Sequence, residues 1–449
     1  MKFLRMRLAY LRYVKDINHL ALPLVLNAVS MMVMQLIDQA MIGRISLEAY
    51  AAVGTLINFL FVIAGVLGAL AISFNIYGSR KIGSSDTLAF RSLFIASIFL
   101  NIIIGALLML ILLILQKPIL SLVYGFEGAI LKDGMQYLSI MSVAVLLQLL
   151  LFTFSTYFKV VKKTKWIFIG STAAAIMNVV FNYLFIFGNF GFPRLGVKGV
   201  AIASVLSLCL NLFIYIYASK EHLKIYIKQV GQYIHDMKFI IQKSWALLGQ
   251  EVLEGGVIII AIEVVIARMG DLELAGYILV SQILAVVLIP MHMYSTAVLT
   301  LVSERYAAKK MRDIRRIPQV GLSLTLMFTL ILSLLAVYFR SEVTALITND
   351  NGLVIYSSGI LLFIILANMF SPVHTVYKSA LQAIGSSMYV LVGTAVVNSV
   401  AFLLMIGSIY WLGLGMSGVF ISLFVSNVVL SLVFYKRYAN VVHRLSRID

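Results

Sequence analysis

The sequence of 449 residues has little charge, little proline and almost no cysteine. Asp, Glu, Lys and Arg together make up 12% of it, about half of the roughly 25% that is usual for soluble domains. Its single cysteine, Cys209, has no partner for a disulfide and provides no paired-thiolate metal site. Because 62% of the residues are hydrophobic, the composition indicates a chain that is surrounded largely by lipid.

The sequence also lacks the short motifs of common enzymes. It contains no Gly-x-x-x-x-Gly-Lys-Ser/Thr phosphate loop, no His-Glu-x-x-His and no Gly-x-Ser-x-Gly. We therefore expect neither an enzyme nor a bound cofactor. The energy for any transport would come from an ion gradient or from the gradient of the substrate itself.

Long apolar runs fill most of the sequence. Each has roughly the 20 residues that a helix needs to cross a bilayer, and the runs are continuous rather than alternating, which excludes a β-barrel. We therefore predict an all-α membrane protein with twelve transmembrane helices. The predicted spans are residues 17–42, 51–77, 89–116, 134–158, 166–188, 196–219, 244–267, 274–300, 317–339, 353–376, 384–410 and 415–435.

The chain contains an internal repeat. Leu195–Ile202 (LGVKGVAI) returns as Leu414–Ile421 (LGMSGVFI) at an offset of 219. Each copy holds six spans, and an even number returns the chain to its starting side, so an axis along the membrane normal should relate the copies. We expect two pseudo-symmetric six-helix bundles, residues 1–219 and 244–449, joined by a cytoplasmic linker, residues 220–243.

The basic residues predict the orientation of the chain. The formal net charge is +17, but Lys and Arg gather in alternate loops, which is a topology signal rather than a nucleic-acid site. We expect both termini in the cytoplasm of a multi-pass protein of the plasma (bacterial inner) membrane, with basic loops that face anionic lipids and no nucleic-acid partner. Only seven of the 35 basic residues fall in loops assigned to the outside: Arg44, Lys117, Lys132, Arg194, Lys198, Arg268 and Arg340.

Four of the eighteen acidic residues lie within predicted spans: Asp38, Glu251, Glu254 and Glu263. A charged side chain at mid-bilayer costs about 2.5–3.5 kcal/mol on insertion scales, so such residues are functional candidates by default. Glu251 and Glu254 are about one turn apart, disfavour double ionisation and suit a proton, Na⁺ or a cationic substrate. A structural role for this pair is the alternative. At an offset of 224, Glu251 corresponds to Asn27 of the first span.

Asp38 belongs to a polar face of the first span. Asn27 lies eleven residues earlier and therefore on the same face, with Gln35 in the stripe between them. In the fifth span, Asn178 and Asn182 share a face, and their amides can donate to and accept from Asp38. Burial favours the neutral carboxyl whereas these hydrogen bonds favour the charged one, so one proton could switch the site. A purely structural link between two helices is the alternative.

Three stretches resemble the multidrug and toxic compound extrusion (MATE) transporters. They are Ile37–Ile45 with Ala51–Gly54, Asn178–Gly188 with Leu195–Ala203, and Ser303–Arg316. The resemblance covers essentially the whole chain. It implies a twelve-helix transporter with alternating access, in which Asp38 takes part in cation coupling and asparagines lie beside it.

The chain also departs from this family. Some members have an acid in the tenth span that acts with one in the seventh, and the closest residue here is Ser371. The resemblance therefore favours H⁺ over Na⁺ as the coupling ion, with Na⁺ at Asp38 or Glu254 as the alternative.

These features together predict a secondary active efflux transporter for drugs or other organic compounds, working as a monomeric antiporter driven by H⁺ or Na⁺. Its substrate is expected to be small, organic, and cationic or amphipathic. The predicted ion-coupling residues are Asp38, Asn178 and Asn182, and the predicted cavity residues are Asn27, Gln35, Glu251 and Glu254.

Two other functions stay open from the sequence. One is a flippase or exporter of a lipid-linked saccharide, peptide or other natural product. Its anionic lipid phosphate would require basic residues in the cavity, and Lys378 is the only clear cation near a span. The other is a membrane-embedded scaffold, which would not need buried acids.

Overall fold

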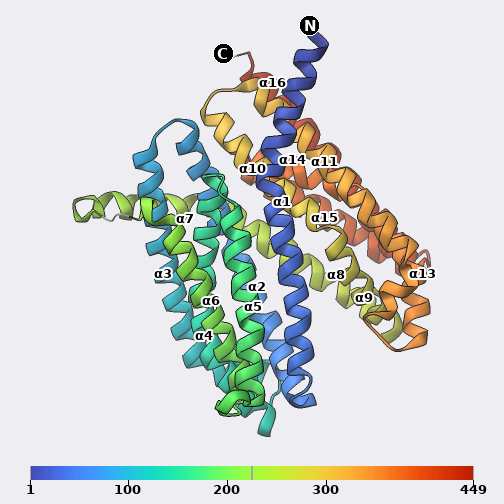
Figure 1. Cartoon of the computed structure of the whole chain (residues 1–449). Coiled ribbons are helices and arrows are strands. Elements are labelled where there is room, and N and C mark those ends of the chain that lie inside the picture. Colours follow the sequence, from blue (N-terminus) through green and yellow to red (C-terminus); the bar gives the residue numbers. More distant parts are fainter. Residues whose placement is uncertain (1, 224–225, 448–449) are drawn as a thin grey trace. The chain divides into compact units, whose positions relative to one another are not determined.

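The computed structural model describes residues 2–223 and 226–447, and these residues are almost entirely helical (Figure 1). Among them there is no β-strand. The predicted all-α fold class is therefore confirmed. The continuous apolar runs form helices because a helix satisfies its own backbone hydrogen bonds, which lipid cannot do.

Six long helices correspond to the first six predicted spans. Three of them, the first, second and fourth, extend beyond the apolar run by a turn or more, because polar residues continue the helix outside the hydrophobic core. They are α1 (Lys2–Ile42), α2 (Leu47–Gly83), α3 (Thr87–Pro118), α4 (Gly128–Val160), α5 (Lys165–Phe187) and α6 (Val197–Ser219). Four short elements join them or follow them: η1 (Ile119–Val123), η2 (Asn189–Gly191), η3 (Lys220–His222) and η4 (Ile227–Gln229).

The second half of the chain is divided into more pieces. Its elements are α7 (Val230–Val252), η5 (Leu253–Val257), α8 (Ile258–Ala267), α9 (Asp271–Val287), α10 (Ile289–Ala307), α11 (Met311–Tyr338), α12 (Arg340–Ala345), α13 (Asn351–Ala367), α14 (Ser371–Ala383), α15 (Ser387–Tyr410) and α16 (Gly415–Leu445).

Three of the predicted spans are interrupted. The span at 274–300 is α9 followed by α10, with a bend of 45°, and the span at 353–376 is α13 followed by α14, with a bend of 42°. Pro290 and Pro372 stand in the first turns of α10 and α14, where the missing N–H breaks the preceding hydrogen-bond ladder. The span at 244–267 runs through α7, the π-helix η5 and α8.

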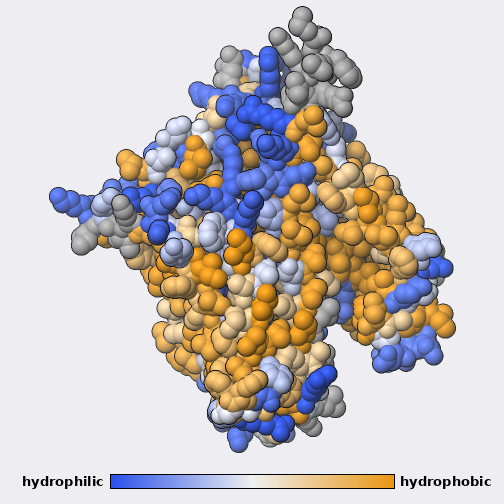
Figure 2. Space-filling view, viewed as in Figure 1, coloured by the Kyte–Doolittle hydropathy of each residue, from blue (hydrophilic) through white to orange (hydrophobic). Residues whose placement is uncertain are grey.

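By length and apolarity, nine helices of the described chain can cross a membrane, and the two bent pairs bring the number to eleven. The α7–η5–α8 segment accounts for the remaining predicted span. Figure 2 shows hydrophobic residues over the sides of the helices and hydrophilic residues gathered near their ends. This distribution is the one that a bilayer requires.

The helices form two packing units. The amino-terminal unit comprises Leu26–Trp245, and the carboxy-terminal unit comprises Met1–Val25 with Ala246–Asp449. Helices α1 and α7 are therefore each divided between the two units. The first part of α1 belongs to the carboxy-terminal unit, and the first part of α7 belongs to the amino-terminal unit. The repeat predicted two bundles, residues 1–219 and 244–449, with the linker 220–243. These bundles stay a prediction, because the packing units are defined by contacts and the predicted bundles by sequence repetition.

A core lies inside each unit. In the amino-terminal unit it joins residues of α2, α4 and α6, such as Leu56, Leu138 and Ala201. In the carboxy-terminal unit it joins α9, α13 and α16, for example through Val280 and Leu361. These cores hold the polar residues of the neighbouring helices in fixed positions.

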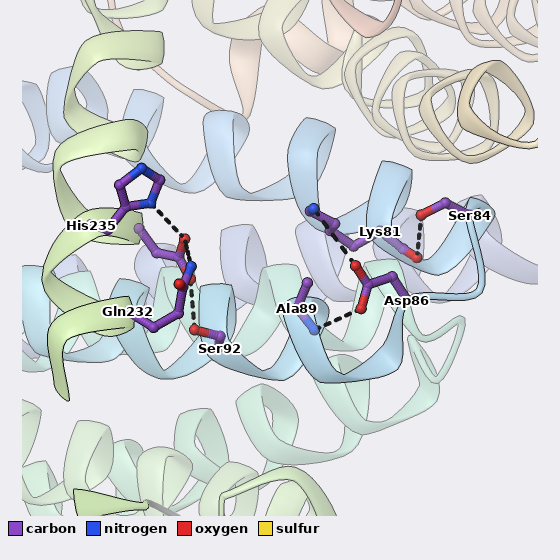
Figure 3. A network of polar contacts seen from close by, with 8 residues as sticks. Lys81, Ser84, Asp86, Ala89, Ser92, Gln232 and His235 are labelled. Carbon is purple, nitrogen blue, oxygen red and sulfur yellow. Dashed lines mark hydrogen bonds and ion pairs between the residues drawn. The ribbon is translucent and has the colours of Figure 1, made fainter. Parts of the chain in front are cut away.

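The first half of α7 is fixed to α3 by a buried carboxylate (Figure 3). Asp236 is 9% exposed and accepts hydrogen bonds from Ser92 Oγ at 2.6 Å and Gln232 Nε2 at 2.9 Å. Near the start of α3, Asp86 accepts from the Ala89 backbone N–H at 3.0 Å. This is an N-cap interaction, which satisfies a donor of the first turn that has no helical partner.

Candidate functional site

Asp38 lies at the centre of a polar site in the amino-terminal unit. Asn182 Nδ2 donates to Asp38 Oδ1 at 2.8 Å. With the Asn178 amide oriented so that its nitrogen faces the carboxylate, that nitrogen lies 2.7 and 2.9 Å from the two Asp38 oxygens. Asn178 and Asn182 are 8% and 0% exposed, so this site is held by buried amides of α5.

The amide partners suit a carboxyl group that changes its protonation. An Asn side chain has both donor and acceptor atoms, so Asn178 and Asn182 can serve either the charged or the protonated form of Asp38. Among the described residues, Asp38 forms no ion pair with a basic side chain. An arginine or lysine beside it would instead hold the carboxyl in its charged form.

The structure adds Tyr137 of α4 to this site. Its side chain is 1% exposed and lies close enough to Asp38 to interact with it electrostatically. No local pattern distinguishes this tyrosine from the other 21 in the sequence. Only the packing of α4 against its neighbours brings it to the carboxyl.

A second polar contact joins α1 and α5. Ser171 Oγ donates to Asn27 Oδ1, so α1 and α5 are linked at two levels, eleven residues apart on α1. Gln35 is exposed and has no side-chain hydrogen bond among the described residues. The structure therefore brings Asn27 to the α5 face, but not Gln35.

The acids of the seventh span belong to the carboxy-terminal unit. Lys378 Nζ of α14 lies 2.6 Å from Glu254 Oε2, and Gln250 Nε2 donates to Glu254 Oε1 at 2.6 Å. Glu251 forms no ion pair and no side-chain hydrogen bond in the described part of the chain. Gln250 was not among the residues predicted from the sequence, although a glutamine within the apolar run 244–267 is a visible signal. The partner of Lys378 was not predicted either.

The hydrogen bonds correct the register of the repeat. Gln250 Nε2 donates to Thr394 Oγ1 at 3.0 Å, and this pair corresponds to Asn27 and Ser171 at a single offset of 223. Asn27 therefore corresponds to Gln250 and not, as the offset of 224 predicted, to Glu251. The error arose because different matching stretches of the two copies give different offsets. A contact between two helices gives the offset of both helices at once.

The tenth span offers no acid at the expected position. Ser371 is 4% exposed, begins α14 and donates its hydroxyl to the Asn368 carbonyl at 2.7 Å. Within residues 2–223 and 226–447, no three His, Cys, Asp or Glu side chains are grouped as metal ligands.

The comparisons with known proteins identify the class of this fold as a multi-pass membrane transporter. The family model described as MatE matches residues 23–184 and 257–411, which is more than half of the chain. The chain therefore belongs to the MATE family of transporters, as the resemblance of its three stretches indicated.

Two curated relatives extend over most of the chain. A probable multidrug resistance protein NorM of Thermotoga maritima is 24% identical over 377 residues, which cover 83% of this chain and 81% of the relative. A protein of the same description from Bacillus cereus is 24% identical over 374 residues, 80% of each chain.

The fold is also that of a solved transporter. The bent form of the Vibrio cholerae MATE transporter VcmN superposes with a TM-score of 0.86 at 20% identity and covers 97% of this chain and 98% of its own. This likeness supports the twelve-helix arrangement and is independent of the individual site residues.

Proposed function

We propose that the protein is a cation-coupled antiporter that exports small organic compounds of cationic or amphipathic character by alternating access. The single observation that carries this proposal is Asp38, an acid within a membrane helix that buried amides hold and that no basic side chain of residues 2–223 and 226–447 neutralises. The names of the NorM relatives, which are described as probable multidrug resistance proteins, support drugs as substrates.

The proposed coupling uses Asp38 as the residue that takes up an entering cation. Asn178 and Asn182 position its carboxyl, and binding of H⁺, which we favour over Na⁺, removes its charge. If one proton exchanges for one monovalent organic cation, no net charge moves and the membrane potential adds nothing. Each unit of pH gradient then contributes about 1.4 kcal/mol, enough for roughly tenfold accumulation of the substrate.

We further propose that the protein resides in the plasma (bacterial inner) membrane as a monomer with both termini in the cytoplasm. The excess of Lys and Arg in alternate loops supports this orientation. The same loops would contact anionic lipids of the inner leaflet.

The test is transport by purified protein in proteoliposomes under a pH gradient or a Na⁺ gradient, applied separately. We expect wild type to transport an organic cation in response to the pH gradient, and Asp38→Asn to lose the response. Asp271→Asn provides the control, because Asp271 is an exposed acid in the first turn of α9. Wild-type transport that needs neither gradient would contradict the antiport proposal.

One contact argues against a flippase for lipid-linked compounds. A lipid phosphate requires an available cation, and Lys378, the cation near the predicted tenth span, is already paired with Glu254 at 2.6 Å. Translocation of a lipid-linked saccharide in the same proteoliposomes, with no response to either ion gradient, would support the flippase instead.

A further inference from the structure

A charged cluster surrounds Lys378 in the carboxy-terminal unit. The Lys378 ammonium lies 2.6 Å from Glu254 Oε2, and the two side chains are 17% and 29% exposed. The pair joins α14 to the π-helix η5; Glu254 lies within the predicted span 244–267, and Lys378 lies two residues beyond the predicted span 353–376. Because neither side chain is fully enclosed, a solute can approach the pair without unfolding the core around it.

A buried amide forms a hydrogen bond with the second carboxylate oxygen of Glu254. Gln250 Nε2 donates to Glu254 Oε1 at 2.6 Å and to Thr394 Oγ1 at 3.0 Å, so both carboxylate oxygens have a partner. Gln250 is 1% exposed, yet its own Oε1 has no hydrogen-bond donor. A buried acceptor without a donor is costly, so the polar groups around Glu254 are not fully satisfied by the protein.

Glu251 gives the cluster a second carboxylate. Lys378 is the cation available to balance the two carboxylates. It interacts electrostatically with Lys378 and with Glu254, but it has no ion pair or side-chain hydrogen bond of its own among residues 2–223 and 226–447. The two imidazoles within electrostatic range of the Lys378–Glu254 pair are His292 of α10 and His374 of α14. With both carboxyls and the lysine ionised, one negative charge remains.

The backbone beside Glu254 is distorted and carries two glycines. Residues Leu253–Val257 form the π-helix η5, a distortion that is frequent at functional sites. Gly255 and Gly256 follow Glu254 directly, and a Cβ atom added to either would meet no atom within 4 Å. The two glycines therefore add no side-chain bulk directly after Glu254.

We propose that this cluster binds one organic monocation and that Lys378 sets the permitted charge of the substrate. Lys378 neutralises Glu254, Glu251 supplies the remaining negative charge, and a second positive charge on the substrate is repelled by the ammonium. The inference rests on the proposed export of organic cations and specifies which of them the carboxy-terminal unit accepts.

The test compares two cations of similar chemistry and different charge. Tetraphenylphosphonium carries one positive charge and p-xylylenebis(triphenylphosphonium) carries two, and their binding to purified protein in detergent is measured by equilibrium dialysis. We expect wild type to bind the monocation at least about tenfold more tightly than the dication. Lys378→Met should improve dication binding by a similar factor, and Lys378→Arg, which keeps the charge, should retain the wild-type preference.

Two further variants separate charge from general damage. Glu254→Gln combined with Lys378→Met removes one charge of each sign, so the preference for the monocation should return. Glu251→Gln leaves the Lys378–Glu254 pair intact and should weaken monocation binding by at least about tenfold. Size-exclusion chromatography verifies that each variant is folded. If Lys378→Met does not fold, Glu251→Gln still tests whether the cluster binds the monocation.

The inference is overturned if Lys378→Met leaves the charge preference unchanged, if Glu251→Gln binds the monocation as wild type does, or if wild type binds neither cation. Equilibrium binding requires no ion gradient. Intact charge selectivity together with gradient-independent transport would therefore refute the proposed coupling and leave this inference standing.

Discussion

At the scale of single residues, the hydrogen bonds of Asp38 depend on a spacing that the sequence shows directly. Asn178 and Asn182 are four residues apart and lie on one face of α5, because neighbouring turns of a helix superimpose such positions. Both amides reach Asp38. The partner of Glu254 could not be found in this way, since Lys378 lies 124 residues further along the chain.

Asn182 is expected to contribute measurably to coupled transport. Asn182→Ala removes the 2.8 Å hydrogen bond to Asp38, and a hydrogen bond to a charged group is worth about 1.5–3 kcal/mol. We expect transport driven by the pH gradient to fall roughly 10- to 100-fold. Asn189→Ala is the matched control, because among the described residues the Asn189 amide donates only to the Tyr183 carbonyl, in an exposed contact. Equal transport by the two variants would remove Asn182 from the site.

At the scale of helices, small residues decide how closely neighbours pack. Gly170 of α5 lies against Tyr215 of α6, and Gly393 of α15 lies against Phe434 of α16. The two glycines are 223 residues apart, the offset of the Asn27–Ser171 and Gln250–Thr394 contacts. The repeat is therefore preserved in the packing of helix pairs as well as in the sequence.

The close approach of α5 and α6 predicts an effect of Gly170→Ala. The added Cβ would contact the Tyr215 ring and lie 2.7 Å from Asn211 Oδ1, so we expect a loss of about 1–3 kcal/mol of stability from overpacking. Thermal unfolding in detergent should show a lower midpoint. Gly65→Ala is the control, since no atom lies within 4 Å of its added Cβ. A midpoint as low for Gly65→Ala as for Gly170→Ala would contradict this account.

At the scale of the whole molecule, the distribution of basic residues is the basis for the proposed orientation. The side chains of Lys and Arg resist transfer across the membrane, so we propose that the loops rich in them lie in the cytoplasm. The two halves of the chain have kept this bias, while their intramembrane polar groups differ. Asp38 and its amides have no polar counterpart at the offset of 223, where Ala261, Ala401 and Met405 stand.

The orientation can be tested because the chain has one cysteine. After Cys209→Ser, a cysteine is introduced at Ser341, which lies in a stretch assigned to the outside, or at Ser446, which follows α16; both residues are exposed. A membrane-impermeant maleimide added to intact cells should label the cysteine at 341 and leave the one at 446 unlabelled. Labelling with the opposite pattern would invert the proposed topology.

The sequence by itself determined the membrane class, the helical fold and the polar face that carries Asp38. These properties follow from apolarity and helical periodicity, which act over neighbouring residues. Only the tertiary structure decided that Tyr137 lies within electrostatic range of Asp38 and that Lys378 neutralises Glu254. Such contacts depend on how helices that are distant in the chain pack against each other, and no local pattern encodes that arrangement.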